Sequence, residues 1–293
     1  MMRSEIDVLT PHNLDEALNL LQEHQTRLKI IAGGSDIIVQ LRDGVIKTDK
    51  LLNLLAVKDL RYIRKTEDRI HIGSLATYGD IVNSELTRKH SWILVSAARQ
   101  IGAIQLQNTA TIGGNLGNAS PAADSLPPLY ALDAIVVTRN KAGRREIPIE
   151  EFFTGYRKTA LKPDELIEEA HFKELSDREC AAYLKLGLRE ANAISIVDVA
   201  VALRERKSVD WFSDARVALG AVAPTIRRAR SCERALVNKP LNAQNMKEAA
   251  ALAAEDTSPI DDIRGSAEYR KQVTVSLVYE ALHAAVFGKG KRS

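Results

Sequence analysis

Two glycine pairs constrain the fold of this chain more than any other feature of its sequence. The first stands in Ala32-Gly-Gly-Ser-Asp36, after the apolar run Leu28–Ala32, which predicts a buried strand. The second stands in Thr111-Ile-Gly-Gly-Asn-Leu-Gly-Asn118. Glycine has no Cβ and tolerates positive φ, so successive backbone N–H groups can turn toward one anion. Together the loops predict an enclosure for a pyrophosphate, although one such pair after a strand is more often only a tight turn.

The glycine loops also exclude two common nucleotide-binding folds. Neither loop reads GxGxxG or GxxxxGK[ST], so the Rossmann and P-loop interpretations fail. Three side chains in the loops, those of Ser35, Thr111 and Asn115, add polar donors to the predicted enclosure.

Metal chemistry is not expected in this chain. Its six histidines are isolated in sequence and form no HExxH or similar pair. Its two cysteines, Cys180 and Cys232, are far apart and cannot hold an iron–sulfur cluster alone. Such sparse thiols favour a reducing, cytoplasmic setting.

Composition narrows the function classes further. The chain has 293 residues, of which 45% are hydrophobic and 27% charged, as in ordinary soluble globular proteins. A net charge of +3, spread among acidic residues, argues against nucleic-acid binding. No apolar run approaches the length that spans a bilayer, and the first residues lack a secretory h-region.

The N-terminal part of the chain alternates short strands and helices. We expect a first helix after Asn13 and a strand at 50–54. A hairpin is expected over 62–73, and helices over 77–85 and 92–101, the second ending at Gly102. The segment 109–123 is rich in small and polar residues without an apolar period, which predicts a loop. A strand follows at 134–137, and these elements form a domain over 1–175, with subdomains of about 1–57 and 58–175.

The pattern changes near His171. Three strands are expected at 183–188, 194–203 and 215–219, followed by helices at 232–236, 245–254 and 267–286, with a loose tail over 288–293. Strands followed by helices predict an α+β class, with a small C-terminal domain over 176–293 built on a three-stranded sheet.

The order of motifs along the chain closely resembles that of one protein family. AGGSD is followed by Ile72-Gly-Ser-Leu-Ala-Thr77, Gln105 to Asn115, Ala119-Ser-Pro-Ala-Ala-Asp124, Lys162-Pro-Asp-Glu-Leu-Ile167 and Tyr183-Leu-Lys185. This series resembles the medium, FAD-binding subunit of the xanthine dehydrogenase and carbon monoxide dehydrogenase family. The resemblance covers nearly the whole chain, including Gly220 to Thr225 and Tyr269-Arg270.

The resemblance implies a fold and a set of cofactor-binding residues. The fold is a two-subdomain, vanillyl-alcohol-oxidase-like (PCMH-type) FAD domain, and the residues are Lys29, Ile30, Ile31, Ala32, Gly33, Gly34, Ser35, Asp36, Thr77, Thr111, Ile112, Gly113, Gly114, Asn115, Asp124, Ile167, Tyr183 and Lys185. Tyr183 would lie beside the isoalloxazine ring and Lys185 at its polar edge. Equally, Tyr183 reads as a half-buried strand tyrosine, and Asp124 as a helix N-cap. Position 35 is Ser where some related flavoproteins carry His, and neither loop contains histidine, so the FAD is expected to be non-covalent.

The resemblance further implies electron transfer in a complex of a molybdenum hydroxylase. The flavin would take electrons from [2Fe-2S] clusters of a small subunit, while a large molybdopterin subunit oxidises the substrate, as a dimer of heterotrimers. The final acceptor would be NAD, quinone or oxygen. Two alternatives stay open: a self-contained flavin oxidase of the vanillyl-alcohol oxidase type, and a flavin-free scaffold subunit.

Overall fold

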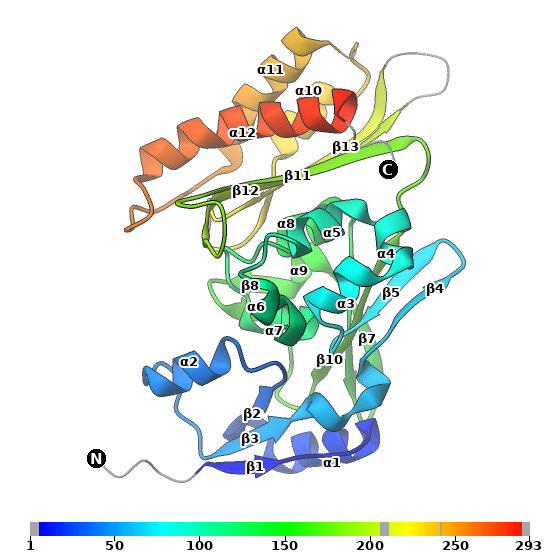
Figure 1. The fold of residues 1–293 in the computed structure, drawn as a ribbon, viewed down its shortest axis with the longest axis vertical. Helices are drawn as coiled ribbons and strands as arrows, with labels where there is room; N and C mark the ends of the chain where they lie inside the picture. The colour runs from blue at the N-terminus through cyan, green and yellow to red at the C-terminus, as the bar shows by residue number, and fades with distance from the viewer. Residues whose placement is uncertain (1–5, 206–210, 241, 289–293) are drawn as a thin grey trace.

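The computed structural model describes residues 6–205, 211–240 and 242–288. Three layers of structure follow one another along the long axis of the molecule (Figure 1). An N-terminal subdomain occupies one end, a middle subdomain lies at the centre, and a C-terminal domain occupies the other end. The predicted division near residue 175 falls in the short connection between the middle subdomain and the C-terminal domain. Of the predicted tail, 289–293 lies outside the described residues.

The N-terminal subdomain is a small parallel sheet of order β1-β3-β2 with one long helix. Its strands are β1 (Asp7–Leu9), β2 (Leu28–Ile31) and β3 (Lys50–Asn53), and its helices are α1 (Leu14–His24) and α2 (Ile37–Arg42). Asn13 caps the N-terminus of α1, because its side-chain oxygen accepts a hydrogen bond from the backbone N–H of Glu16 at 2.9 Å. Ala17, Leu18 and Leu21 then face the core at helical spacing, as expected.

The middle subdomain contains a five-stranded antiparallel sheet of order β4-β5-β10-β6-β7. Its strands are β4 (Ile63–Thr66), β5 (Arg69–Gly73), β6 (Ile135–Asn140), β7 (Gly143–Pro148) and β10 (Leu166–Lys173), with a small hairpin of β8 (Phe153–Gly155) and β9 (Lys158–Thr159). Its helices are α3 (Tyr78–Asn83), α4 (Glu85–His90), α5 (Trp92–Ala98), α6 (Ile104–Thr109), α7 (Ile112–Asn118), α8 (Leu126–Ala131) and α9 (Ile149–Phe152). The helices pack on one face of the sheet (Figure 1), and residues such as Ile70 and Ile72 form the core between them.

The C-terminal domain is a second antiparallel sheet with helices on its outer face. It comprises β11 (Glu179–Gly187), β12 (Ser195–Glu205), β13 (Phe212–Gly220), β14 (Arg227–Arg228), α10 (Arg230–Leu236), α11 (Ala243–Leu252) and α12 (Ala267–Phe287). In β12, Val199, Val201 and Leu203 face these helices, whereas Ala200 and Ala202 face the middle subdomain. The sheet is therefore buried on both faces, and its alanine face lets α5 and α8 approach closely.

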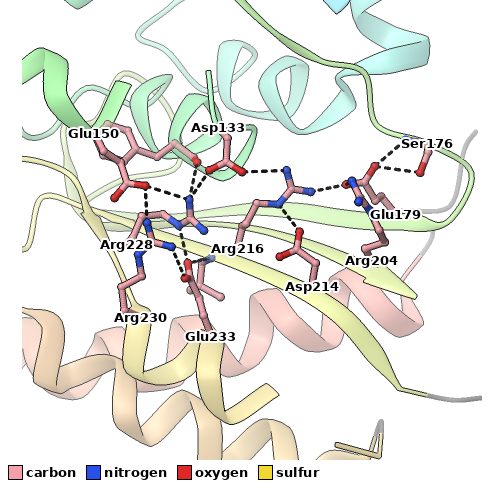
Figure 2. Close-up of polar contacts among 12 residues, drawn as sticks. Asp133, Glu150, Ser176, Glu179, Arg204, Asp214, Arg216, Arg228, Arg230 and Glu233 are labelled. Atoms are coloured by element: carbon pink, nitrogen blue, oxygen red, sulfur yellow. Dashed lines mark hydrogen bonds and ion pairs between the residues drawn. The ribbon is translucent and has the colours of Figure 1, made fainter. Parts of the chain in front are cut away.

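A network of ion pairs crosses the interface between the middle subdomain and the C-terminal domain (Figure 2). Arg228 is buried, and its Nη1 lies 2.6 Å from Asp133 Oδ1 of the middle subdomain, while its Nε lies 2.5 Å from Glu233 Oε1. Arg230 binds Glu150 of the middle subdomain at 2.6 Å. Arg216 pairs with Asp133 at 3.5 Å and also with Glu179, so the network ties both parts of the chain together.

Several sequence predictions differ from the structure. The segment 109–123 is not a loop throughout, because it contains α7 and the end of α6. Thr111 caps α7, because its side-chain oxygen accepts a hydrogen bond from the N–H of Gly114 at 3.1 Å. The sequence did not predict this helix, because its glycines give no apolar period. The helix predicted at 77–85 is α3 and ends at Asn83, and the one predicted at 92–101 ends at Ala98, while α4 between them was not predicted.

Two further differences concern strands. The sheet of the C-terminal domain has a fourth strand, β14, whose two residues are too few to give a sequence signal. The strand predicted as buried at 28–32 is buried only at Leu28, whereas Lys29 is exposed and Ile30 is half-buried. Both of these residues line a cavity, which explains why an apolar strand is not fully covered.

Candidate functional site: a cavity between the first two subdomains

A cavity of about 600 Å³ lies between the N-terminal and middle subdomains. Its walls come from β2, the AGGSD loop and α2 on one side, and from α7, the β8–β9 turn and the start of β10 on the other. This volume is within the range of small-molecule and cofactor sites. The structure brings the two glycine loops together here, since Gly33 packs directly on Thr109 and Ala110, just before Thr111.

The AGGSD loop supplies free donors to this cavity. A Cβ on Gly33 would lie 1.8 Å from the carbonyl oxygen of Thr109, so only glycine fits there. Gly34 has φ of 77°, a left-handed conformation that favours glycine. Within the described part of the chain, the backbone N–H groups of Gly33, Gly34, Ser35 and Asp36 donate no hydrogen bond. Four successive unused donors beside a cavity suit an anion such as a diphosphate.

The TIGGN segment contributes differently from the sequence prediction. Its backbone N–H groups are already used: Ile112 donates to Ala76 O at 3.0 Å, Gly113 to Ser74 O at 2.9 Å, and Asn115 to Thr111 O at 3.0 Å. A Cβ on Gly113 would lie 2.5 Å from the Ser74 side chain, so this glycine is required by packing. The segment therefore shapes the cavity wall and offers side chains, while the free backbone donors belong to the first loop.

Most of the predicted cofactor-binding residues line this one cavity. They are Lys29, Ile30, Ala32, Gly33, Gly34, Ser35, Asp36, Thr111, Gly113, Gly114, Asn115 and Ile167. Three others do not line it and have structural contacts instead. Ile31 pairs with Asn53 in the sheet, Thr77 caps α3 and bridges to Thr111, and Ile112 is fully buried in the core.

Asp124 and Lys185 form a separate buried ion pair, away from the large cavity. Lys185 Nζ lies 2.6 Å from Asp124 Oδ2, and the side chains are only 6% and 9% exposed. Ser195 donates a second hydrogen bond to Asp124 at 2.6 Å. Burial raises the pKa of Asp124, and the charge of Lys185 opposes that shift. Asp124 does not cap α8, whose first residue is preceded by Ser125 without a side-chain cap.

Tyr183 is buried next to this pair and points toward Asp198. Its hydroxyl donates to Asp198 Oδ2 at 3.1 Å, and burial raises the pKa of Tyr183. Asp198 is fully buried, and burial followed by the charge of Asp124 raises its pKa well above the ordinary value. Lys185 alone of these residues lines a second, smaller cavity of about 320 Å³, with Gln100 and residues 186–190.

The predicted cofactor-binding residues leave out several polar residues that line the large cavity. Gln40, Asn118, Arg157 and Lys162 all line it, but they come from four separate segments. Arg157 stands in Gly155-Tyr-Arg-Lys158, which matches no binding motif, so only the fold brings it to the cavity. Among the described residues, no group of His, Cys, Asp and Glu is arranged to hold a metal ion.

Two known domain families match this chain. Residues 4–172 match the family described as the FAD binding domain in molybdopterin dehydrogenase, and residues 182–285 match the CO dehydrogenase flavoprotein C-terminal domain. This chain belongs to the FAD-binding subunits of the molybdopterin dehydrogenases. It is thus an oxidoreductase subunit of the xanthine and carbon monoxide dehydrogenase type, with FAD as its cofactor, and the predicted fold is confirmed.

Individual relatives agree with the family assignment along nearly the whole chain. The nicotinate dehydrogenase FAD-subunit of Eubacterium barkeri is 31% identical over 92% of both chains. The carbon monoxide dehydrogenase medium chain of Hydrogenophaga pseudoflava is 28% identical over 97% of this chain and 98% of its own. A solved structure of carbon monoxide dehydrogenase from that organism, lacking the Mo-pyranopterin moiety, matches with a TM-score of 0.92, 29% identity and coverage of 97% and 98%.

The hydrogen-bond donors around the large cavity suit the diphosphate of FAD. The AGGSD loop presents four unused N–H groups and has no Cβ at Gly33 and Gly34, and Lys29 and Arg157 add positive charge nearby. None of the described helices is both long and apolar enough to cross a bilayer.

Proposed function

We propose that this chain holds FAD non-covalently in the large cavity and passes electrons within a molybdenum hydroxylase complex. The observation that carries the proposal is the row of four unused backbone N–H groups at the cavity wall. These donors would bind the diphosphate, and Ser35 and Asn115 would add side-chain contacts. When bound, the flavin supplies the redox chemistry, because it accepts electrons singly or as a pair.

The role of the chain itself is to bind and orient the FAD and to exclude water from it. Gly33 and Gly34 let the backbone approach the anion, and Ile30 and Ile167 provide apolar walls that exclude water. No histidine or cysteine lies in either glycine loop, which supports non-covalent attachment. We place Asp124, Tyr183 and Lys185 at the flavin ring end on the resemblance alone, because they do not line the cavity.

The proposed partners complete the electron path. Electrons would arrive from [2Fe-2S] clusters of a small subunit and leave to NAD, quinone or oxygen, while a large molybdopterin subunit oxidises the substrate. We also propose a dimer of heterotrimers. Two features support dependence on partners: relatives are named as FAD-subunits or medium chains, and the described residues offer no metal-binding group. Cys180 and Cys232 are both buried and are not joined in a disulfide, which supports a cytoplasmic setting.

A self-contained oxidase is the alternative that an experiment must exclude. The C-terminal region argues against it, since 182–285 matches a flavoprotein domain of CO dehydrogenase. Anaerobic mixing of the isolated, FAD-loaded chain with purines, aldehydes or carbon monoxide should leave the flavin absorption unchanged. Stoichiometric bleaching by any of these, with no other subunit present, would establish a self-contained oxidase.

The mode of attachment has its own test. Acid precipitation of the loaded chain should release all of the yellow colour into the supernatant, because the flavin is held only by hydrogen bonds, charge and packing. Flavin that remains with the precipitated protein would mean a covalent bond.

A further inference from the structure

Arg157 lies at the edge of the large cavity on the turn between β8 and β9. We propose that its guanidinium is a binding group for the diphosphate of FAD, acting opposite the AGGSD loop. This inference rests on the proposed placement of FAD in the large cavity, and it assigns a role to a residue that the glycine motifs do not include.

The contacts of Arg157 connect it to the first glycine loop through one amide side chain. Its Nη1 donates to the side-chain oxygen of Asn118 at 2.8 Å. Asn118 in turn donates to Asp36 Oδ1, at the end of the AGGSD loop, at 2.8 Å. The same Asn118 oxygen accepts from Gln40 of α2 at 2.9 Å. One amide therefore links the β8–β9 turn to the wall of the N-terminal subdomain, and it fixes where the guanidinium lies.

The charge of Arg157 is available to a ligand. Its described partners are neutral, namely the Asn118 amide and the Tyr156 hydroxyl, the latter at 3.4 Å. Among the described residues, no carboxylate oxygen lies within ion-pair distance of its guanidinium. A guanidinium carries five donors in a planar fork, and the Asn118 and Tyr156 contacts occupy two of them. The remaining donors can bind phosphate oxygens in pairs, which a lysine ammonium cannot do.

The backbone of Arg157 supports a role beyond the turn itself. Its φ is 51°, a left-handed conformation that glycine adopts at far lower cost than arginine. Such strain in a non-glycine residue of a ligand site is a reason to ask what its side chain does. Here the side chain reaches the cavity, so the turn has a binding group at a position where glycine would serve the backbone better.

The test compares ligands that do and do not contain a diphosphate. The full-length chain is freed of flavin and titrated with FAD, ADP and riboflavin by calorimetry. Arg157→Gln should raise the Kd for FAD and ADP on the order of tenfold to a hundredfold, because a charge-assisted pair is lost. Riboflavin should bind as to the wild type. Arg157→Lys should fall between the two, and raising the salt concentration should weaken FAD binding less in Arg157→Gln than in the wild type.

Two further variants keep the test decisive. Arg157→Gly removes the same charge while relieving the left-handed strain, so it should fold well and still lose affinity for FAD. Lys158→Gln removes the neighbouring exposed cation of the same hairpin, which does not line the cavity, and should bind FAD normally. Wild-type FAD affinity in both Arg157→Gln and Arg157→Gly would overturn the inference while leaving the proposed function intact. A wild-type chain that binds no flavin would overturn both.

Discussion

The middle subdomain meets its two neighbours in opposite ways. Toward the N-terminal subdomain it leaves a cavity of about 600 Å³ with unused backbone donors at its wall. Toward the C-terminal domain it is largely filled, because α5 and α8 pack on the alanine face of the sheet, and buried ion pairs join the two parts. The first interface has room for a cofactor, whereas the cavity of about 320 Å³ beside Gln100 and Lys185 at the second interface is only about half as large.

The two interfaces should therefore respond differently to the binding of FAD. Empty volume and unsatisfied donors are unfavourable in a folded protein unless a ligand fills them, so the first interface should gain stability when FAD binds. The second interface has its polar groups largely paired within the chain and should not depend on the cofactor. The predictions below test that contrast, beginning with the filled interface.

The largest effect should come from Arg228→Met at the filled interface. Arg228 is 5% exposed in its side chain and binds both Asp133 and Glu233. Its loss leaves the buried Glu233 carboxylate with less compensation, which should reduce the free energy of unfolding by about 3–5 kcal/mol. Urea unfolding of the full chain measures this.

Arg230→Met is the matched control for that variant. Arg230 pairs with Glu233 and Glu150, but its side chain is 49% exposed. Because solvent screens such a pair, its removal should cost less than about 1 kcal/mol. Equal losses in the two variants would mean that burial of the ion pair does not set its contribution.

Lys185→Met should have the next largest effect, about 3 kcal/mol. It leaves the buried Asp124 carboxylate without its cation, although Ser195 still donates to that carboxylate. Adding Asp124→Asn should restore part of the lost stability, because a neutral amide needs no cation. If the double variant is no more stable than Lys185→Met alone, the ion pair does not account for the loss.

The sequence predicts part of the first interface but little of the second. The AGGSD loop could be found because glycine after an apolar strand is a local signal, and the structure places it at a cavity. Arg157 could not be found, since it matches no motif and meets Asn118 only through the folding of distant segments. The buried Asp124–Lys185 pair could not be predicted for the same reason, because the partners lie 61 positions apart in the sequence.

The second sheet illustrates a signal that was present but incomplete. In β12, alanines alternate with valines and leucine, a pattern that fits burial on both faces. The alternation identifies a strand, but it does not say that the small residues face α5 and α8. Similarly, Thr111 marks a helix start, yet the glycines after it have no apolar period.

A smaller effect on stability is expected at the hollow interface, together with a loss of binding. Gly34→Ala places a Cβ on a residue with φ of 77°, which should cost about 1–2 kcal/mol. It should also weaken FAD binding, because this residue supplies one of the unused donors at the cavity. Thermal unfolding and FAD titration measure the two effects separately.

Gly44→Ala separates strain from binding. Gly44 has a similar φ of 72°, and a Cβ there would meet nothing within 4 Å. It does not line the cavity, so the stability should fall by a similar amount while the affinity for FAD stays at the wild-type value. Equal losses of affinity in Gly34→Ala and Gly44→Ala would mean that the left-handed strain, and not the cavity, accounts for the binding defect.

The smallest change in stability is expected for Asp198→Asn, whose signature is a dependence on pH. Asp198 is fully buried, its Oδ1 has no hydrogen-bond partner among the described residues, and its Oδ2 accepts from Tyr183 at 3.1 Å. Burial and the charge of Asp124 raise its pKa well above 3.8, so the folded chain retains a proton that the unfolded chain has released. Stability from this group is complete below the unfolded value and is lost as pH rises toward the folded one, by at most about 1.4 kcal/mol per pH unit. An amide of the same shape carries no such proton. Asp198→Asn should therefore unfold within about 1 kcal/mol of the wild type at mildly acidic pH and gain on it as the pH rises. Urea unfolding across that range measures both chains, and parallel curves would mean that Asp198 is already ionised in the folded protein.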